Sequence, residues 1–132
     1  MGKIFFATFI ALLVLASCKP LDSTVGSTSD TQINSLAFTV DTSYIDIAHK
    51  RLVARGTVKN NSRVTVTSPW YVEGQFYTDD SFDTKLGGNN TEIGVPLSPG
   101  QQTFWTIYFS STNVDVMQYP EFRVSDLRGI YK

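Results

Sequence analysis

The chain has 132 residues with 11 basic and 12 acidic side chains, which gives a formal net charge of −1. This balance gives no reason to expect nucleic-acid binding, and it supplies no polybasic attraction to anionic lipid. One cysteine and one histidine exclude an internal disulfide and a metal site built from several imidazoles or thiolates.

The N-terminal residues have the pattern of a secretory signal. Lys3 supplies a positive charge, and an apolar run from Ile4 to Leu15 follows it, broken only by Thr8. The run is too short to cross a bilayer as a helix, which takes about 20 apolar residues. It ends in Leu15-Ala16-Ser17-Cys18, where the single cysteine follows two small residues. A short N-terminal core helix and a cleaved signal without lipid attachment are the alternatives.

This ending resembles the lipobox of bacterial lipoproteins. The resemblance implies cleavage between Ser17 and Cys18 and a diacylglyceryl thioether on Cys18, usually with an acylated amino terminus. Two or three acyl chains give stable attachment, whereas one chain binds only marginally, so the implied partner of Cys18 is a membrane. In enteric-type lipoproteins an Asp after the cysteine retains the protein in the inner membrane. Lys19 therefore favours the outer membrane if the cell envelope has one.

The segment after Cys18 predicts a flexible tether. Residues 18–34 are rich in Ser, Thr, Asp and Gly and show no hydrophobic period. We therefore divide the chain into a signal peptide at 1–17, the lipidated cysteine and its linker at 18–34, and one domain at 35–132. Removal of residues 1–17 would leave 115 of the 132 residues, a suitable length for one domain.

The domain shows the period-two alternation of β-strands and no sustained helical period. Strands are predicted at 36–40, 44–48, 52–59, 64–77, 91–97, 102–110 and 121–127. Turns are predicted at 60–62, 87–90 and 98–100, where Asn, Gly, Ser and Pro cluster. Trp70 and Phe76 share one face of their strand, as Trp105 and Phe109 do in theirs. The pattern predicts an all-β, immunoglobulin-like antiparallel β-sandwich of about seven strands, preceded by the signal peptide and the flexible tether.

Three segments in the middle of the chain support this expectation. They are Gly56-Thr57-Val58-Lys59-Asn60-Asn61-Ser62, Gln75-Phe76-Tyr77-Thr78-Asp79 and Leu97-Ser98-Pro99-Gly100-Gln101. Together they resemble the strand ends and the hairpin entry of the FxLYD family of immunoglobulin-like domains, although Thr78 interrupts the second motif. The family has no shared enzymatic activity, so the resemblance implies a binding or scaffolding domain. From the residues themselves, we expect Gly56 to lie where two sheets approach closely, and Asn60 and Asn61 to cap backbone groups.

No residue pattern predicts an enzyme or a cofactor. His49 has no nucleophile motif near it, which favours a surface turn over a catalytic base. Asp79, Asp80 and Asp83 could bind calcium, but their segment lacks the Gly and the terminal Glu of an EF-hand loop, which favours a solvated hairpin tip. We therefore expect no catalytic residues, no metal and no cofactor.

Aromatic side chains give the remaining functional signal. Tyr71, Tyr77, Phe104 and Tyr108 have the strand parity opposite to that of the expected core. One sheet could therefore present Tyr71, Tyr77 and Tyr108 as an exposed binding face. Alternatively, these rings cover sheet edges or pack under loops. The leading hypothesis is a non-enzymatic, lipid-anchored cell-envelope domain with a structural or protein-interaction role. A carbohydrate- or peptide-binding receptor that uses the aromatic face is the second hypothesis, and a small envelope hydrolase is the third.

The lipobox resemblance predicts that Cys18→Ala releases the protein from membranes or leaves an uncleaved precursor, because no other thiol can accept the lipid. Metabolic labelling with a fatty-acid analogue should mark the wild-type protein and not the variant. Equal labelling of both proteins would contradict the lipobox reading.

Overall fold

The computed structural model describes residues 31–132, so the predicted signal peptide, Cys18 and most of the predicted linker lie outside the described residues. The elements are β1 (Thr31–Ile33), β2 (Leu36–Asp46), β3 (Arg51–Asn60), β4 (Trp70–Tyr77), β5 (Lys85–Ile93), β6 (Gln102–Phe109), the short 3-10 helix η1 (Val116–Gln118) and β7 (Arg123–Tyr131). Strand β1 lies in the range predicted as linker, so folded structure begins before residue 35.

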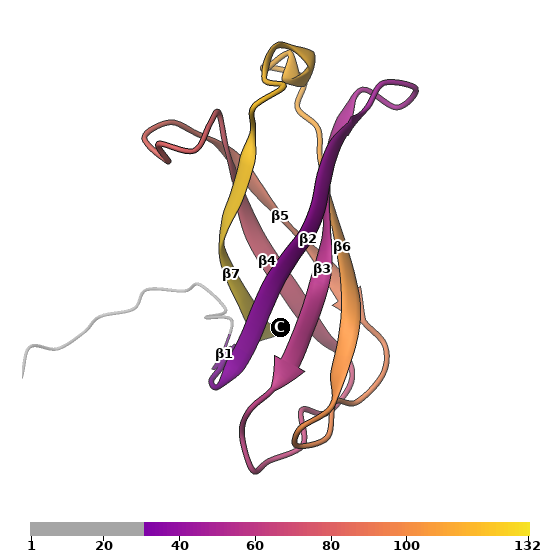
Figure 1. Ribbon diagram of the computed structural model, residues 1–132. Helices are drawn as coiled ribbons and strands as arrows, with labels where there is room; N and C mark the ends of the chain where they lie inside the picture. The colour runs from indigo at the N-terminus through magenta and orange to yellow at the C-terminus, as the bar shows by residue number, and fades with distance from the viewer. Residues whose placement is uncertain (1–30) are drawn as a thin grey trace, which may run out of the picture.

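Seven strands form two antiparallel sheets that face each other, as Figure 1 shows. One sheet has four strands in the order β1-β7-β4-β5, and the other has three in the order β2-β3-β6. The chain changes sheet four times: between β1 and β2, between β3 and β4, between β5 and β6, and between β6 and β7. The predicted all-β sandwich of about seven strands is confirmed, and such crossing connections are typical of immunoglobulin-like sandwiches.

The antiparallel strands give the sandwich two ends with different loops. The end that carries β1, which we call the N-terminal end, holds the connections 34–35, 61–69 and 94–101 and lies low in Figure 1. The opposite, distal end holds the connections 47–50, 78–84 and 110–122. The sheets run between these ends, so their outer faces point sideways.

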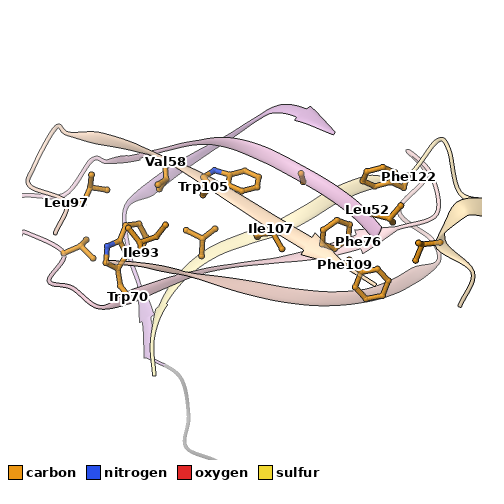
Figure 2. Close-up of a cluster of buried hydrophobic side chains, with 14 residues drawn as sticks. Leu52, Val58, Trp70, Phe76, Ile93, Leu97, Trp105, Ile107, Phe109 and Phe122 are labelled. Carbon is orange, nitrogen blue, oxygen red and sulfur yellow. The ribbon is translucent and has the colours of Figure 1, made fainter. Parts of the chain in front are cut away.

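The core lies between the sheets and is built around two tryptophans (Figure 2). Trp70 and Trp105 are 0% and 2% exposed, and Phe76 stacks on Phe109 with 5.3 Å between ring centroids. Each indole N–H donates to a backbone carbonyl, that of Val95 for Trp70 and that of Thr57 for Trp105, at 3.0 Å in both cases. The predicted core faces of β4 and β6 are therefore confirmed, because their large rings are buried and their polar atoms are bonded.

Gly56 leaves room for the Trp105 indole and for the backbone of β2. A Cβ at residue 56 would stand 2.6 Å from the Trp105 indole and 1.8 Å from the Thr39 carbonyl oxygen. Both neighbours belong to the same sheet as Gly56. The expected close approach exists, but it lies within one sheet rather than between the two sheets.

Strand β2 joins two segments that the sequence predicts as separate strands, 36–40 and 44–48. A β-bulge between Val40 and Thr42 leaves Asp41 without a cross-strand partner. The extra residue reverses which side chains face the core, since alternation has a period of two. Phe38 therefore packs against the core before the bulge and Ile45 after it, while Tyr44 points outward opposite Val53.

Residues 87–90, predicted as a turn, lie inside β5, and the turn lies earlier, at 78–84. At Gly87 and Gly88, neighbouring side chains occupy the space that a Cβ atom would need. A Cβ at Gly87 would lie 2.5 Å from the Phe109 ring, and one at Gly88 would lie 2.4 Å from the Gln75 amide. Here glycine marks close packing rather than chain reversal. The aspartates at 79, 80 and 83 lie in or next to the turn, as expected for a hairpin tip.

Asn60 is the buried polar side chain of the described part, with no exposed surface. Its amide nitrogen donates to the carbonyls of Val64, at 2.8 Å, and Leu97, at 2.9 Å. Its amide oxygen accepts from the backbone N–H of Ser62 at 2.9 Å and from the Ser62 hydroxyl at 2.7 Å. The expected capping role of Asn60 is confirmed, and this one side chain ties the end of β3 to the 61–69 and 94–101 loops.

The burial of Trp105 predicts a large stability loss for Trp105→Ala, roughly 3–5 kcal/mol, as for other large aromatic truncations. Phe104 is a matched control, because it directly precedes Trp105 on the same strand and is 78% exposed. Denaturant melts should show little change, within about 0.5 kcal/mol, for Phe104→Ala. Similar losses for the two variants would contradict the assignment of faces in β6.

The bonding of Asn60 predicts that Asn60→Ala destabilises the protein by roughly 2–4 kcal/mol, because two loop carbonyls lose their buried donor. Asn61→Ala removes an exposed amide of the same type one residue later and should change stability little. Hydrogen exchange should show faster exchange at the Val66 and Leu97 amides in the Asn60 variant. Unchanged exchange at these two amides would contradict the bracing role.

Candidate binding surface

The three tyrosines predicted to share a face do not lie on one sheet. Tyr71 and Tyr77 are on β4 in the four-stranded sheet, and Tyr108 is on β6 in the three-stranded sheet. Strand parity correctly places all three away from the core. It does not tell which sheet a strand joins, and the chain changes sheet between β5 and β6. The expectation of one platform made of Tyr71, Tyr77 and Tyr108 is corrected accordingly.

Tyr77 is engaged in contacts within the domain and is only 9% exposed. Its hydroxyl donates to Asp126, which raises the pKa of Tyr77 above its ordinary value. The ring of Phe82 stands edge-on to it at 5.4 Å, and the Lys85 ammonium lies 5.8 Å from its ring centroid. The alternative that a ring packs under a loop holds for this residue.

Tyr71 is half-buried, and a lysine ammonium lies over one face of its ring. The Lys132 ammonium lies 4.4 Å from its centroid and also donates to the Asn90 side chain at 2.8 Å. The Tyr71 hydroxyl donates to Glu92 at 3.3 Å, and the negative charge of Glu92 raises the pKa of the phenol. Tyr71 therefore belongs to a network of polar contacts on the four-stranded sheet.

The outer face of the three-stranded sheet carries exposed aromatic and arginine side chains instead. We call the following set the aromatic–arginine surface: Tyr44, Arg51, Arg55, Phe104 and Tyr108. Phe104 is 78% exposed, Tyr44 39% and Tyr108 38%. Tyr44, Val53 and Tyr108 lie side by side on three adjacent strands. Val53 points outward but is fully buried, because it lies between the rings of Tyr44 and Tyr108.

Two arginines lie over the two tyrosine rings of this surface. The Arg51 guanidinium lies 3.9 Å from the Tyr108 centroid, and that of Arg55 lies 5.4 Å from the Tyr44 centroid. Arg51 also donates to Asp46 at 2.9 Å. Stacked guanidinium groups give the rings a preferred orientation, since a cation is attracted to the face of an aromatic ring.

Asp46 holds the turn beside this surface. Its carboxylate is bonded to Arg51 and lies 2.8 Å from His49 Nδ1. Burial tends to raise the pKa of Asp46, but hydrogen bonds from Arg51 and His49 outweigh burial, and the net effect lowers it. The His49 side chain is 66% exposed, which confirms the expected surface turn.

Phe104 lies among hydroxyl groups at the N-terminal end of the same face. It is the cross-strand neighbour of Thr57, whose hydroxyl lies 2.5 Å from that of Thr39. An exposed flat ring beside threonine hydroxyls offers both an apolar contact and hydrogen-bonding groups. Such a combination suits a ligand with alternating apolar and polar faces.

The other predicted candidates do not form a site. Asp79 accepts hydrogen bonds from the hydroxyl and the backbone N–H of Ser81, and these bonds lower the pKa of Asp79. Within residues 31–132, no three His, Cys, Asp or Glu side chains are grouped to hold a metal ion. No helix in this range is long and apolar enough to cross a membrane. The lipidation residue Cys18 lies outside the described residues.

Sequence reasoning missed Tyr44 and both arginines of the surface. Even-numbered alternation from Leu36 places Tyr44 in the core, and only the bulge at Asp41 turns it outward. The adjacent pair Tyr44 and Ile45 could have indicated the bulge. Both side chains are large and apolar, but strict alternation can bury only one of two adjacent residues. The pairing of Arg51 with Tyr108 joins residues far apart in the sequence and leaves no local pattern.

Comparisons with known proteins give no relative for this chain: no family model matches it, and no curated protein and no solved structure matches it. The resemblances to the lipobox and to FxLYD domains stay predictions.

Proposed function

We propose that this protein is a non-enzymatic binding domain, held at the bacterial cell envelope by lipid on Cys18, that recognises its partner through the aromatic–arginine surface. The observation that carries the proposal is the exposure of Phe104, Tyr44 and Tyr108 on one sheet face. Aromatic and arginine side chains dominate binding energy at protein interfaces, because they bury large areas and still make polar contacts. The 94–101 loop, which Asn60 holds in place, leads directly into β6. Phe104 therefore lies near the start of a strand whose N-terminal end is held by hydrogen bonds.

Preorganisation supports this choice of surface. Arg51 is held by Asp46 and lies on Tyr108, and the three strands fix the spacing of the rings. A partner would therefore meet side chains that lose little conformational freedom on binding. The opposite outer face offers less exposed aromatic surface, because Tyr71 is half-buried and Tyr77 is only 9% exposed.

A carbohydrate receptor is the second candidate, and the surroundings of Phe104 favour it. Sugars present an apolar face to aromatic rings and hydroxyl groups to polar neighbours. Thr57 and Thr39 supply hydroxyls beside Phe104, and Arg55 supplies a charge that would suit an acidic sugar. A protein partner would instead engage the whole surface, including Tyr44 and Tyr108.

The proposed function predicts that Phe104→Ser weakens binding by roughly tenfold or more, as expected for a largely exposed ring that a partner buries. Ile47→Ser is the matched control, because Ile47 is 73% exposed but lies at the distal end. Both variants should keep their folding stability. Binding of the mature lipidated chain to envelope polysaccharides and to cross-linked envelope proteins should be compared.

The combined variant Tyr44→Ser, Phe104→Ser and Tyr108→Ser extends the test. Loss of polysaccharide binding with Phe104→Ser alone favours the receptor, whereas dependence of a protein cross-link on all three rings favours the interaction domain. Retention of every wild-type partner by the folded combined variant would contradict a role for this surface.

A further inference from the structure

Two exposed valines project from the N-terminal end of the sandwich. Val64 is 72% exposed in the 61–69 loop, and Val95 is 54% exposed in the 94–101 loop. Both loops lie at the end where β1 begins (Figure 1). Their near neighbours Val66 and Leu97 are buried, at 3% and 2% exposed.

The backbone at both valines is held by buried side chains. The Val64 carbonyl accepts from Asn60, at 2.8 Å, and the Val95 carbonyl accepts from the Trp70 indole at 3.0 Å. Val66 and Leu97 join the two loops through a pair of backbone hydrogen bonds, each 2.9 Å long. The loops therefore present the valines outward from a braced backbone, and docking would cost little ordering.

A groove runs beside Val64 at the same end. Its volume is about 260 Å³, and its walls come from β1, the 61–69 loop and Tyr131. Ile33, Val64, Val66 and Tyr131 give it a mainly apolar lining. The apolar character of this end thus extends beyond the two valines.

Charge is distributed unequally between the two ends. The connections of the N-terminal end contain a single charged residue, Arg63. Those of the distal end contain five acidic residues and one lysine: Asp79, Asp80, Asp83, Asp115, Glu121 and Lys50. An anionic surface would repel the distal end and accept the N-terminal end.

We propose that the N-terminal end docks on the lipid surface, with Val64 and Val95 at the level of the head groups and Arg63 against anionic phosphates. The proposal rests on the lipid anchor of the proposed function. Apolar side chains with a nearby cation are the combination that binds bilayer interfaces. The chain enters this end through β1, so the surface that Cys18 would anchor is the nearest one available.

Chain length alone does not impose this arrangement. Thirteen residues lead from Cys18 to Thr31, and a chain of that length spans at most about 45 Å. The domain could therefore stand off the membrane, and its own surface decides whether it docks. Docking holds the strands upright, so the aromatic–arginine surface faces sideways, open to partners along the membrane.

The test uses the mature lipidated chain in vesicles of equal parts phosphatidylcholine and phosphatidylglycerol. With Cys18 lipidated, a single introduced cysteine carries a nitroxide, either in Thr65→Cys at the N-terminal end or in Ser81→Cys at the distal end. Both positions are exposed. Collision with oxygen and with a water-soluble nickel complex should place the nitroxide at residue 65 in the head-group region and that at residue 81 in water.

Charge reversal supplies a matched pair of variants. Arg63→Glu should lower the ratio of docked to undocked protein by about fivefold or more, the factor for one basic residue at an anionic surface. Lys50→Glu makes the same change in net charge at the distal end and should leave the ratio unchanged. Val64→Ser with Val95→Ser should also reduce docking.

The alternatives give different results. Protein that floats with the vesicles while residue 65 stays in water overturns docking and leaves the anchor intact. Protein that does not float overturns the anchor and docking together. Shielding of the nitroxide at residue 65 in Cys18→Ala protein without vesicles would overturn lipid docking, because the N-terminal segment or a second copy would then cover this end. Shielding that depends on protein concentration would identify the second copy, and shielding that does not would identify the N-terminal segment.

Discussion

The buried amide of Asn60 is the contact on which the N-terminal end depends. A buried amide has to satisfy all its hydrogen-bonding groups, because an unpaired polar group in a core is costly. Asn60 does so by bonding the 61–69 loop and the 94–101 loop together with the end of β3. These loops carry the exposed valines, so a packing requirement inside the sandwich determines how the proposed membrane-facing surface is presented.

One extra residue in β2 has a comparable effect on the sheet face. The bulge at Asp41 places Ile45 against the core and Tyr44 outside, next to Val53. Without the bulge, the outer face would lack one of its three rings. A local irregularity in an edge strand therefore completes the aromatic–arginine surface, which agrees with the frequent occurrence of bulges at sheet edges and near functional sites.

The two surfaces fit one arrangement of the protein. Overall charge is close to balanced and points to no partner, but the antiparallel strands sort acidic residues to the distal end and leave Arg63 as the one charge in the opposite loops. The net charge therefore predicts no partner, but the fold distributes the charged residues unequally between the two ends of the domain. An anchored domain with its N-terminal end and Arg63 towards lipid would present the sheet face sideways and the acidic end away from the membrane.

Sequence alone was enough to place the large rings of β4 and β6 in the core and to predict the turns at Asn60 and at Gly100. Large rings at alternate positions, such as Trp105 and Phe109, have only one face to bury, so local periodicity was sufficient for the sandwich. The lipobox-like segment before residue 19 is likewise a linear pattern, and its prediction needs no fold.

Only the folded structure shows which strands share a sheet, because no local sequence signal marks the change of sheet between β5 and β6. For that reason Tyr108 was separated from Tyr71 and Tyr77 and joined to Arg51 and Tyr44. The glycines of β5 show the same limit: they resemble a turn in sequence, and only the ring of Phe109 against Gly87 explains why they lie within a strand.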